Sequence, residues 1–201
     1  LGVERFIDES ERPYGCVDTA KLPAFLANLA AQPPQTTRTV IVVGRFAAMT
    51  PSPNVVSNRR GTFQANGPRL PADQIDSAHV LAEGLGATLQ TLQQLPRTTV
   101  VLLAQPPELE FVPMNCNRLQ LWQATANCYT PRAAVDDTMR ASRAVIARVH
   151  AAFPSVTMID PTPLFCDDTQ CMVMQAGYPL YTDTNHLTPY AARQVWQLLL
   201  R

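Results

Sequence analysis

Three short apolar runs constrain the fold of this 201-residue chain more than any other feature. They read TVIVV at residues 39–43, TTVVLLA at 98–104 and VTMI at 156–159. Short continuous runs of β-branched and aliphatic residues are typical of strands that are buried on both faces, as they are in a parallel sheet. We therefore expect the three runs to form the centre of one parallel sheet.

Amphipathic segments separate the three runs and follow the last one. The first such segment begins near Asp18, before the first run, and two more span residues 72–95 and 131–152, between the runs. The last follows Thr188, whose side chain suits an N-cap. Strand and helix thus alternate along the chain, a pattern that indicates a parallel sheet with crossover helices on both faces. We predict a single α/β domain over residues 1–201, a three-layer sandwich in which helices flank a central parallel sheet.

Composition narrows the class of partner. The chain carries 16 basic and 16 acidic residues, so its formal net charge is zero. This balance argues against nucleic acid or an anionic membrane surface as a partner and favours a neutral one. No apolar run reaches the roughly 18 residues of a membrane span, and Leu1–Asp8 is too short and too acidic for a signal peptide. Any export signal or membrane anchor is therefore expected outside this chain.

Five cysteines indicate the redox compartment. Cys116 and Cys128 flank one loop-like stretch, and Cys166 and Cys171 flank another. Because no CxxC motif is present, zinc binding is disfavoured, and we expect two local disulfides, Cys116–Cys128 and Cys166–Cys171. Such disulfides indicate an oxidising compartment, either the periplasm or the extracellular space. Cys16 is left over: either its partner lies upstream of the chain, or it is a buried free thiol.

The clearest chemical signal is the pair Asp183 and His186, in the polar connector before the last helix. A neighbouring carboxylate fixes the tautomer of a histidine and stabilises the imidazolium that forms when the ring takes a proton from a hydroxyl nucleophile. The alternative is a surface aspartate beside a helix-capping histidine. Ligands of open parallel sheets bind beyond the carboxyl ends of the strands. Gly44, Gln105 and Asp160 stand at those ends, so we expect them to converge with the pair on one edge.

The C-terminal part of the chain combines three motifs. Asp160-Pro161 ends the third predicted strand, Cys166 and Cys171 follow, and Asp183-Thr184-Asn185-His186-Leu187-Thr188 leads into the last helix. This succession resembles the last block of the SGNH-fold hydrolases. More closely, it is similar to the SGNH domains fused to membrane acyltransferases that O-acylate bacterial surface polysaccharides. In that family, an aspartate three residues before a histidine leads into His-Leu-Ser or His-Leu-Thr and a helix.

The resemblance implies an SGNH-type sheet with flavodoxin-like strand order and a serine-type O-acyltransferase or esterase, with acetyl as the expected acyl group. Carried over by position, His186 is the general base, Asp183 is the acid that orients it, and Gly44 offers a backbone N–H to the oxyanion. The substrates would be an acyl donor and a polysaccharide or glycan acceptor, with no metal and no organic cofactor. The domain would be periplasmic or extracellular, and tethered through a membrane acyltransferase domain upstream in the same polypeptide.

The chain departs from the family in its first block and at two further positions. The Gly-Asp-Ser nucleophile block is absent, and the nearest stretch, Phe6–Ser10, has an extra residue and no glycine, so Ser10 is a poor match. Phe46 stands where an oxyanion asparagine is expected, and Ala191 replaces a glycine. One interpretation is that the chain begins after the nucleophile block, and the serine lies upstream of Leu1. The others are an SGNH relative that has lost catalysis and acts as a carbohydrate-binding or assembly module, and an unrelated α/β protein with an accidental Asp-x-x-His.

Overall fold

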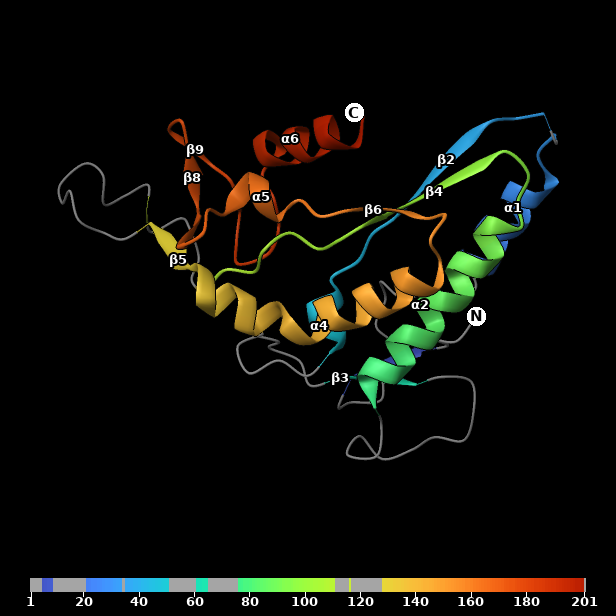
Figure 1. Cartoon of the computed structure of the whole chain (residues 1–201), viewed down its shortest axis with the longest axis horizontal. Helices are drawn as coiled ribbons and strands as arrows, with labels where there is room; N and C mark the ends of the chain where they lie inside the picture. Colours follow the sequence, from blue (N-terminus) through green and yellow to red (C-terminus); the bar gives the residue numbers. More distant parts are fainter. Residues whose placement is uncertain are drawn as a thin grey trace. The chain divides into compact units, whose positions relative to one another are not determined.

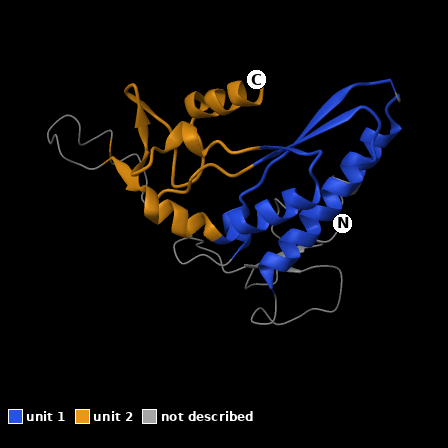
Figure 2. Ribbon diagram, in the orientation of Figure 1, with its two compact units in different colours: residues 1–51, 56–103, 141–158 blue, residues 52–55, 104–140, 159–201 orange. Residues whose placement is uncertain are grey.

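The computed structural model describes residues 5–8, 21–33, 35–50, 61–64, 76–110, 116 and 128–200. The chain divides into two compact units (Figure 2). Unit 1 comprises Leu1–Pro51, Val56–Leu103 and Ala141–Met158, and unit 2 comprises Ser52–Val55, Ala104–Arg140 and Ile159–Arg201. The expectation of a single domain over residues 1–201 stays a prediction. Within the described ranges, no helix is both long enough and apolar enough to cross a membrane.

The main sheet has three strands in the order β2-β4-β6 (Figure 1). They are β2 (Arg38–Val42), β4 (Thr98–Leu103) and β6 (Thr157–Ile159). β2 and β4 run parallel, and Val40 lies opposite Val100. The helices that alternate with these strands are α1 (Lys21–Ala31), α2 (Ser77–Gln93) and α4 (Arg132–Ala152). The predicted α/β class, with a parallel sheet and helices around it, is therefore confirmed.

The core of unit 1 follows from the alternation of side chains along the strands. Val40 and Val42 share a face with their β4 partners Val100 and Leu102, because successive side chains of a strand point to opposite faces. Leucines of α2 recur every three or four residues, which places them on one side of the helix. Val100 and Leu102 belong to a buried cluster, and the partly buried Val40 and Val42 pack against it. The residues that α2 and α4 contribute to the cluster are Leu81, Leu85, Leu89, Leu92, Val145, Ile146 and Val149.

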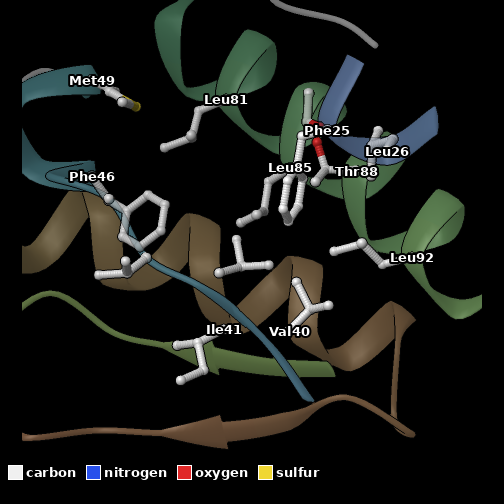
Figure 3. A pocket seen from close by; sticks show the side chains of 14 residues that line it. Phe25, Leu26, Val40, Ile41, Phe46, Met49, Leu81, Leu85, Thr88 and Leu92 are labelled. Atoms are coloured by element: carbon white, nitrogen blue, oxygen red, sulfur yellow. The ribbon is translucent and has the colours of Figure 1, made fainter. Parts of the chain in front are cut away.

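An apolar hollow of about 380 Å³ opens between α1, β2 and α2 in unit 1 (Figure 3). Val40 and Val42 line it from the sheet, and Leu85 lines it from α2. Phe25 of α1, whose side chain is 49% exposed, also lines the hollow. The segment that follows β2 borders the hollow through Gly44.

The connector between β2 and α2 contains two elements that the sequence did not indicate. η1 (Phe46–Met49) follows β2 closely, and β3 (Gly61–Gln64) lies farther along the chain. β3 pairs antiparallel with β1 (Arg5–Asp8). Each of these strands has four residues and lacks a continuous apolar run. Their formation depends on pairing across a long sequence separation, which local propensity does not encode.

The described part of unit 2 contains two small antiparallel ladders, two helices of its own and the first part of α4, up to Arg140. β5 (Tyr129–Pro131) pairs with β7 (Gln170–Met172), and β8 (Met174–Gln175) pairs with β9 (Tyr178–Pro179). Ala176 and Gly177 join β8 to β9 with positive φ angles of 50° and 81°, a backbone region that glycine enters without strain. α5 (Thr162–Phe165) lies between β5 and β7 in the sequence, and α6 (Pro189–Leu199) follows β9. The connector before α6 carries the predicted Asp–His pair.

Candidate active site

Residues 182–186, the site loop, rest on a buried stem. Leu180 is completely buried, and Tyr181 is 2% exposed. Tyr181 forms a β-bridge with Leu187, and the backbone N–H of Thr182 donates to the carbonyl oxygen of His186 at 2.8 Å. The two ends of the site loop are therefore held together at its base.

Asp183 and His186 contact each other within the site loop. Nδ1 of His186 lies 2.6 Å from Oδ2 of Asp183. The other carboxylate oxygen, Oδ1, accepts the backbone N–H of Asn185 at 2.9 Å and that of His186 at 2.7 Å. A carboxylate partner favours the tautomer that carries its hydrogen on Nδ1, so Nε2 of His186 is left as the proton acceptor. The structure thus brings the two predicted residues together, while their catalytic role stays a prediction.

Hydrogen bonds keep Asp183 charged. Partial burial raises the pKa of Asp183, but the backbone N–H groups of Asn185 and His186, together with the imidazole, outweigh burial and hold that pKa below its ordinary value. The carboxylate is therefore ionised at neutral pH and can stabilise an imidazolium. The side chain of His186 is 71% exposed, which leaves the ring accessible to a reacting group. Among the described residues, no three His, Cys, Asp or Glu side chains gather where they could hold a metal ion.

A buried carboxylate, Glu108, lies in the segment that contacts the site loop. Glu108 is 4% exposed and accepts a hydrogen bond from Nε2 of Gln105, which is 6% exposed. The N–H of Leu109 donates to the carbonyl oxygen of Thr184 at 2.8 Å, so the segment after β4 is attached to the site loop. Burial raises the pKa of Tyr181, and the charge of Glu108 raises it further. Sequence interpretation missed Glu108, whose only signal was an acidic residue among apolar and proline neighbours.

Asp160 and Gly44, the other two residues predicted at strand ends, make local contacts next to their own strands. Oδ1 of Asp160 accepts the N–H of Thr162 at 2.9 Å and so holds the start of α5. Gly44 belongs to unit 1, where a Cβ atom would lie 3.2 Å from the ring of Phe46. That contact explains a small residue at this position, and the proposed oxyanion role of Gly44 stays a prediction. Ser10 and Cys16 lie outside the described residues.

The structure forms both expected disulfides. The Cα atoms are 5.6 Å apart in Cys116–Cys128 and 3.9 Å apart in Cys166–Cys171. Cys166 and Cys171 are buried, and they close the turn that Asp167 begins. These two bridges leave Cys16 as the only cysteine of the sequence outside the predicted pairs.

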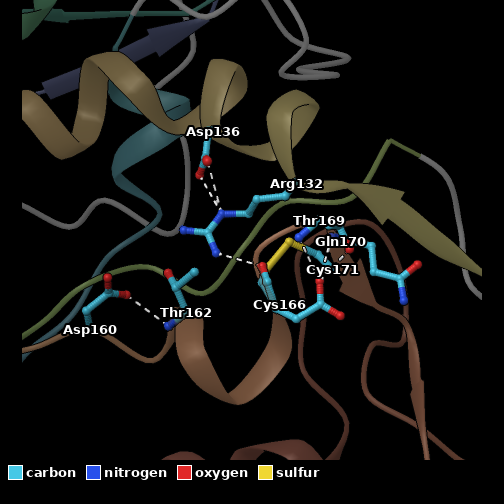
Figure 4. Close-up of a disulfide and its surroundings, with 9 residues drawn as sticks. Arg132, Asp136, Asp160, Thr162, Cys166, Thr169, Gln170 and Cys171 are labelled. Atoms are coloured by element: carbon cyan, nitrogen blue, oxygen red, sulfur yellow. Dashed lines mark hydrogen bonds and ion pairs between the residues drawn. A yellow bond between two sulfur atoms is a disulfide. The ribbon is translucent and has the colours of Figure 1, made fainter.

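Contacts around the second disulfide connect its turn to α4 (Figure 4), and the neighbouring Phe165 contacts the stem of the site loop. Nε of Arg132 donates to the two carboxylate oxygens of Asp136 at 2.9 and 3.0 Å, and Nη1 donates to the carbonyl oxygen of Asp167 at 3.1 Å. The ring of Phe165, at the end of α5, packs against Tyr181 with centroids 5.5 Å apart. The end of α5, next to the disulfide-closed turn, therefore supports the stem from which the site loop projects.

A parallel α/β sheet and an Asp–His pair just before the last helix together describe an SGNH-type domain. The sequence model of the SGNH domain fused to AT3 domains matches residues 2–201, and the chain therefore belongs to this family. This confirms the resemblance drawn from the sequence. No curated protein sequence matches the chain.

A solved structure agrees with this assignment at the level of the fold. The chain is similar to the periplasmic domain of a lipopolysaccharide acetyltransferase from Salmonella ser. Paratyphi A, with a TM-score of 0.55 and 11% sequence identity. The likeness covers 99% of this chain and 67% of the Salmonella chain. At this identity it supports the fold and assigns no residue a role.

Proposed function

We propose that this domain belongs to an enzyme that transfers or removes acyl groups, with acetyl as the expected group, on a cell-envelope polysaccharide. Membership of the SGNH family fused to AT3 domains and the fold shared with a lipopolysaccharide acetyltransferase domain support the setting. The observation that carries the chemistry is the 2.6 Å contact between Asp183 and Nδ1 of His186. It leaves Nε2 of the exposed imidazole as a base for a hydroxyl nucleophile.

The proposed reaction is acyl transfer through a serine ester. A serine hydroxyl attacks the acyl carbon while Nε2 of His186 takes its proton, and Asp183 stabilises the imidazolium. Backbone N–H groups, with that of Gly44 as a candidate, bind the oxyanion of the tetrahedral intermediate. His186 returns the proton to the leaving group. In the second step Nε2 takes the proton of a sugar hydroxyl or of water as that oxygen attacks the serine ester, and the serine oxygen leaves with this proton. The serine is expected in a Gly-Asp-Ser segment upstream of Leu1, with Ser10 as the weaker candidate.

The proposed location is the periplasm or the extracellular space, with the domain tethered through an AT3 acyltransferase domain. The family description supports the fusion, and the two disulfides suit an oxidising compartment. In this arrangement the membrane domain supplies the acyl group, and the SGNH domain delivers it to a glycan acceptor.

Replacement of His186 tests the catalytic proposal. In the intact polypeptide, including any upstream segment, we expect His186→Ala to lower kcat/KM for p-nitrophenyl acetate by roughly 10²- to 10⁴-fold, because the general base is lost. The matched control is His79→Ala, since His79 is an exposed histidine on α2 that pairs with Glu83 at 3.2 Å. A folded His186→Ala protein with the wild-type rate would show that the pair is not catalytic.

A non-catalytic glycan-binding or assembly module is the second candidate. Phe46 at the position of the family's oxyanion asparagine favours it, because a phenyl ring cannot donate a hydrogen bond to an oxyanion. If the intact polypeptide hydrolyses no activated acetyl ester but still binds glycan, this candidate replaces the enzymatic one.

A further inference from the structure

The proposed reaction leaves unexplained an exposed pair of stacked tyrosines in unit 2. The rings of Tyr178 and Tyr190 lie with centroids 4.9 Å apart and planes 24° from parallel. Tyr178 belongs to β9 and is 58% exposed, whereas Tyr190 lies in the first turn of α6 and is partly buried. More than half of Tyr178 remains open to solvent, so the stacked pair presents aromatic surface that a ligand can reach.

Two amide side chains lie beside the rings. Gln175 is the cross-strand partner of Tyr178 in the β8–β9 hairpin, so both side chains are on the same face of that hairpin. Gln194 lies four residues after Tyr190 and therefore on the same side of α6. Nε2 of Gln194 donates to Oε1 of Gln175 at 2.8 Å. We call these four residues the ring–amide surface.

The ring–amide surface and the site loop share one anchor, Thr188. Its hydroxyl donates to the carbonyl oxygen of Pro179 in β9 at 2.7 Å and accepts the N–H of Ala191 in α6 at 3.3 Å. Its backbone N–H donates to the carbonyl oxygen of Leu180, in the stem of the site loop, at 3.0 Å. The hairpin, the helix and the Asp183–His186 loop are thereby joined within one short stretch of chain.

We propose that the ring–amide surface is a subsite for one pyranose unit of the acceptor glycan, an inference that rests on the proposed function. A pyranose has a face of C–H groups, which pack against the electron-rich face of an aromatic ring. Its edges carry hydroxyl groups that both donate and accept hydrogen bonds. A glutamine amide can pair with either, because its carbonyl oxygen accepts and its NH₂ group donates. None of the four side chains is charged at neutral pH, which suits a neutral sugar.

Sugar binding can be measured separately from ester chemistry. The experiment is saturation-transfer difference NMR on the intact polypeptide with the methyl pyranosides of glucose, galactose, mannose and rhamnose as probes. At least one probe should give a signal at its ring C–H protons, and Tyr178→Ala should weaken its affinity roughly three- to tenfold, because the stacking face is lost. Tyr178→Trp should keep the signal, since an aromatic face remains.

Trp196→Ala is the matched control for a general loss of exposed aromatic surface. Trp196 is 52% exposed, on α6 but six residues beyond Tyr190, which puts it on a different side of the helix. It should leave the affinity unchanged. Should Tyr178→Ala not fold, Gln194→Leu tests the same surface, because it removes the amide and keeps the helix; it too should weaken binding.

Three results would overturn the subsite: no signal from any of the four glycosides, unchanged affinity in folded Tyr178→Ala and Gln194→Leu proteins, or an equal loss in Trp196→Ala. Failure of the proposed function looks different. If the proposed function is wrong but the subsite exists, ester hydrolysis is absent or independent of His186, while glycoside binding still depends on Tyr178.

Discussion

At the residue scale, the two oxygens of Asp183 have separate tasks. Oδ1 accepts two backbone N–H groups and so fixes the turn, while Oδ2 contacts Nδ1 of His186. An asparagine could keep the first task, since its carbonyl oxygen can replace Oδ1. Its NH₂ group would then face Nδ1 and favour the tautomer that carries its hydrogen on Nε2. The variant therefore separates the shape of the loop from the chemistry of the pair.

For Asp183→Asn we predict a nearly unchanged fold and a kcat lowered by roughly 10³- to 10⁴-fold, because Nε2 would no longer accept a proton. Initial rates with p-nitrophenyl acetate and circular dichroism of the same sample check this. Asp137→Asn is the control, since Asp137 pairs with Arg140 at 2.8 Å on the surface of α4. A rate loss in both variants would point to a general charge effect instead.

The lowered pKa of Asp183 also determines how its carboxylate responds to pH. Because the pKa is lower in the folded than in the unfolded protein, ionised Asp183 stabilises the folded state at any pH above about 3.9, its ordinary value. That contribution is lost as the pH falls through the lowered folded value. Neutral or mildly acidic conditions therefore leave the Asp183 carboxylate able to orient His186.

At the element scale, α6 determines where the site loop ends. Thr188 is 8% exposed, and its extended backbone and hydroxyl form the N-cap of α6. Pro189 follows in the first turn, where the missing N–H is not needed by the helix. The same hydroxyl also binds the carbonyl oxygen of Pro179. One side chain therefore stabilises both the helix end and the neighbouring hairpin.

For Thr188→Ala we predict a loss of about 1 to 2 kcal/mol in the free energy of unfolding, because an N-cap hydrogen bond is lost and the partly buried carbonyl of Pro179 loses its donor. Urea unfolding measures this loss. Thr188→Ser is the control, since it keeps the hydroxyl and should lose much less. Equal losses in the two variants would attribute the effect to the methyl group and not to the hydrogen bonds.

At the scale of the whole molecule, the sequence predicted what local pattern encodes. The runs around Val40, Val100 and Ile159 became strands, and Thr188 became an N-cap, because apolar periodicity and capping chemistry act over a few residues. The spacing of Asp183 and His186 also sufficed to suggest their contact. The structural features that the sequence did not predict depend on contacts between residues that lie far apart in the sequence.

The features that were missed show this dependence. The β8–β9 hairpin has only two residues in each strand, and the stacking of Tyr178 on Tyr190 joins this hairpin to a separate helix. Glu108 is buried, and the segment after β4 that carries it contacts the site loop, far along the sequence. No pattern in a local window carries such information, since burial is set by whichever segments meet in the fold.

The last prediction concerns the two disulfides, which bear on the stability of the whole chain. Cys166–Cys171 closes a short loop and Cys116–Cys128 a longer one, with sequence separations of 5 and 12. In the chain-entropy account such loops contribute roughly 2 and 3 kcal/mol, a large part of the stability of a typical domain, about 5 to 15 kcal/mol. A reducing compartment would therefore destabilise this protein, whereas an oxidising one preserves it.

Thermal unfolding with and without dithiothreitol checks this, and we expect reduction to lower the Tm by many degrees. The test uses a Cys16→Ser variant, so that the four paired cysteines are the only thiols released. Alkylation without reduction should then leave the intact mass unchanged, and alkylation after reduction should add four groups. Four groups added before reduction would contradict both bridges, and an unchanged Tm after complete reduction would show that stability comes from the packed core alone. The first of these results would also remove the main sequence argument for an oxidising compartment.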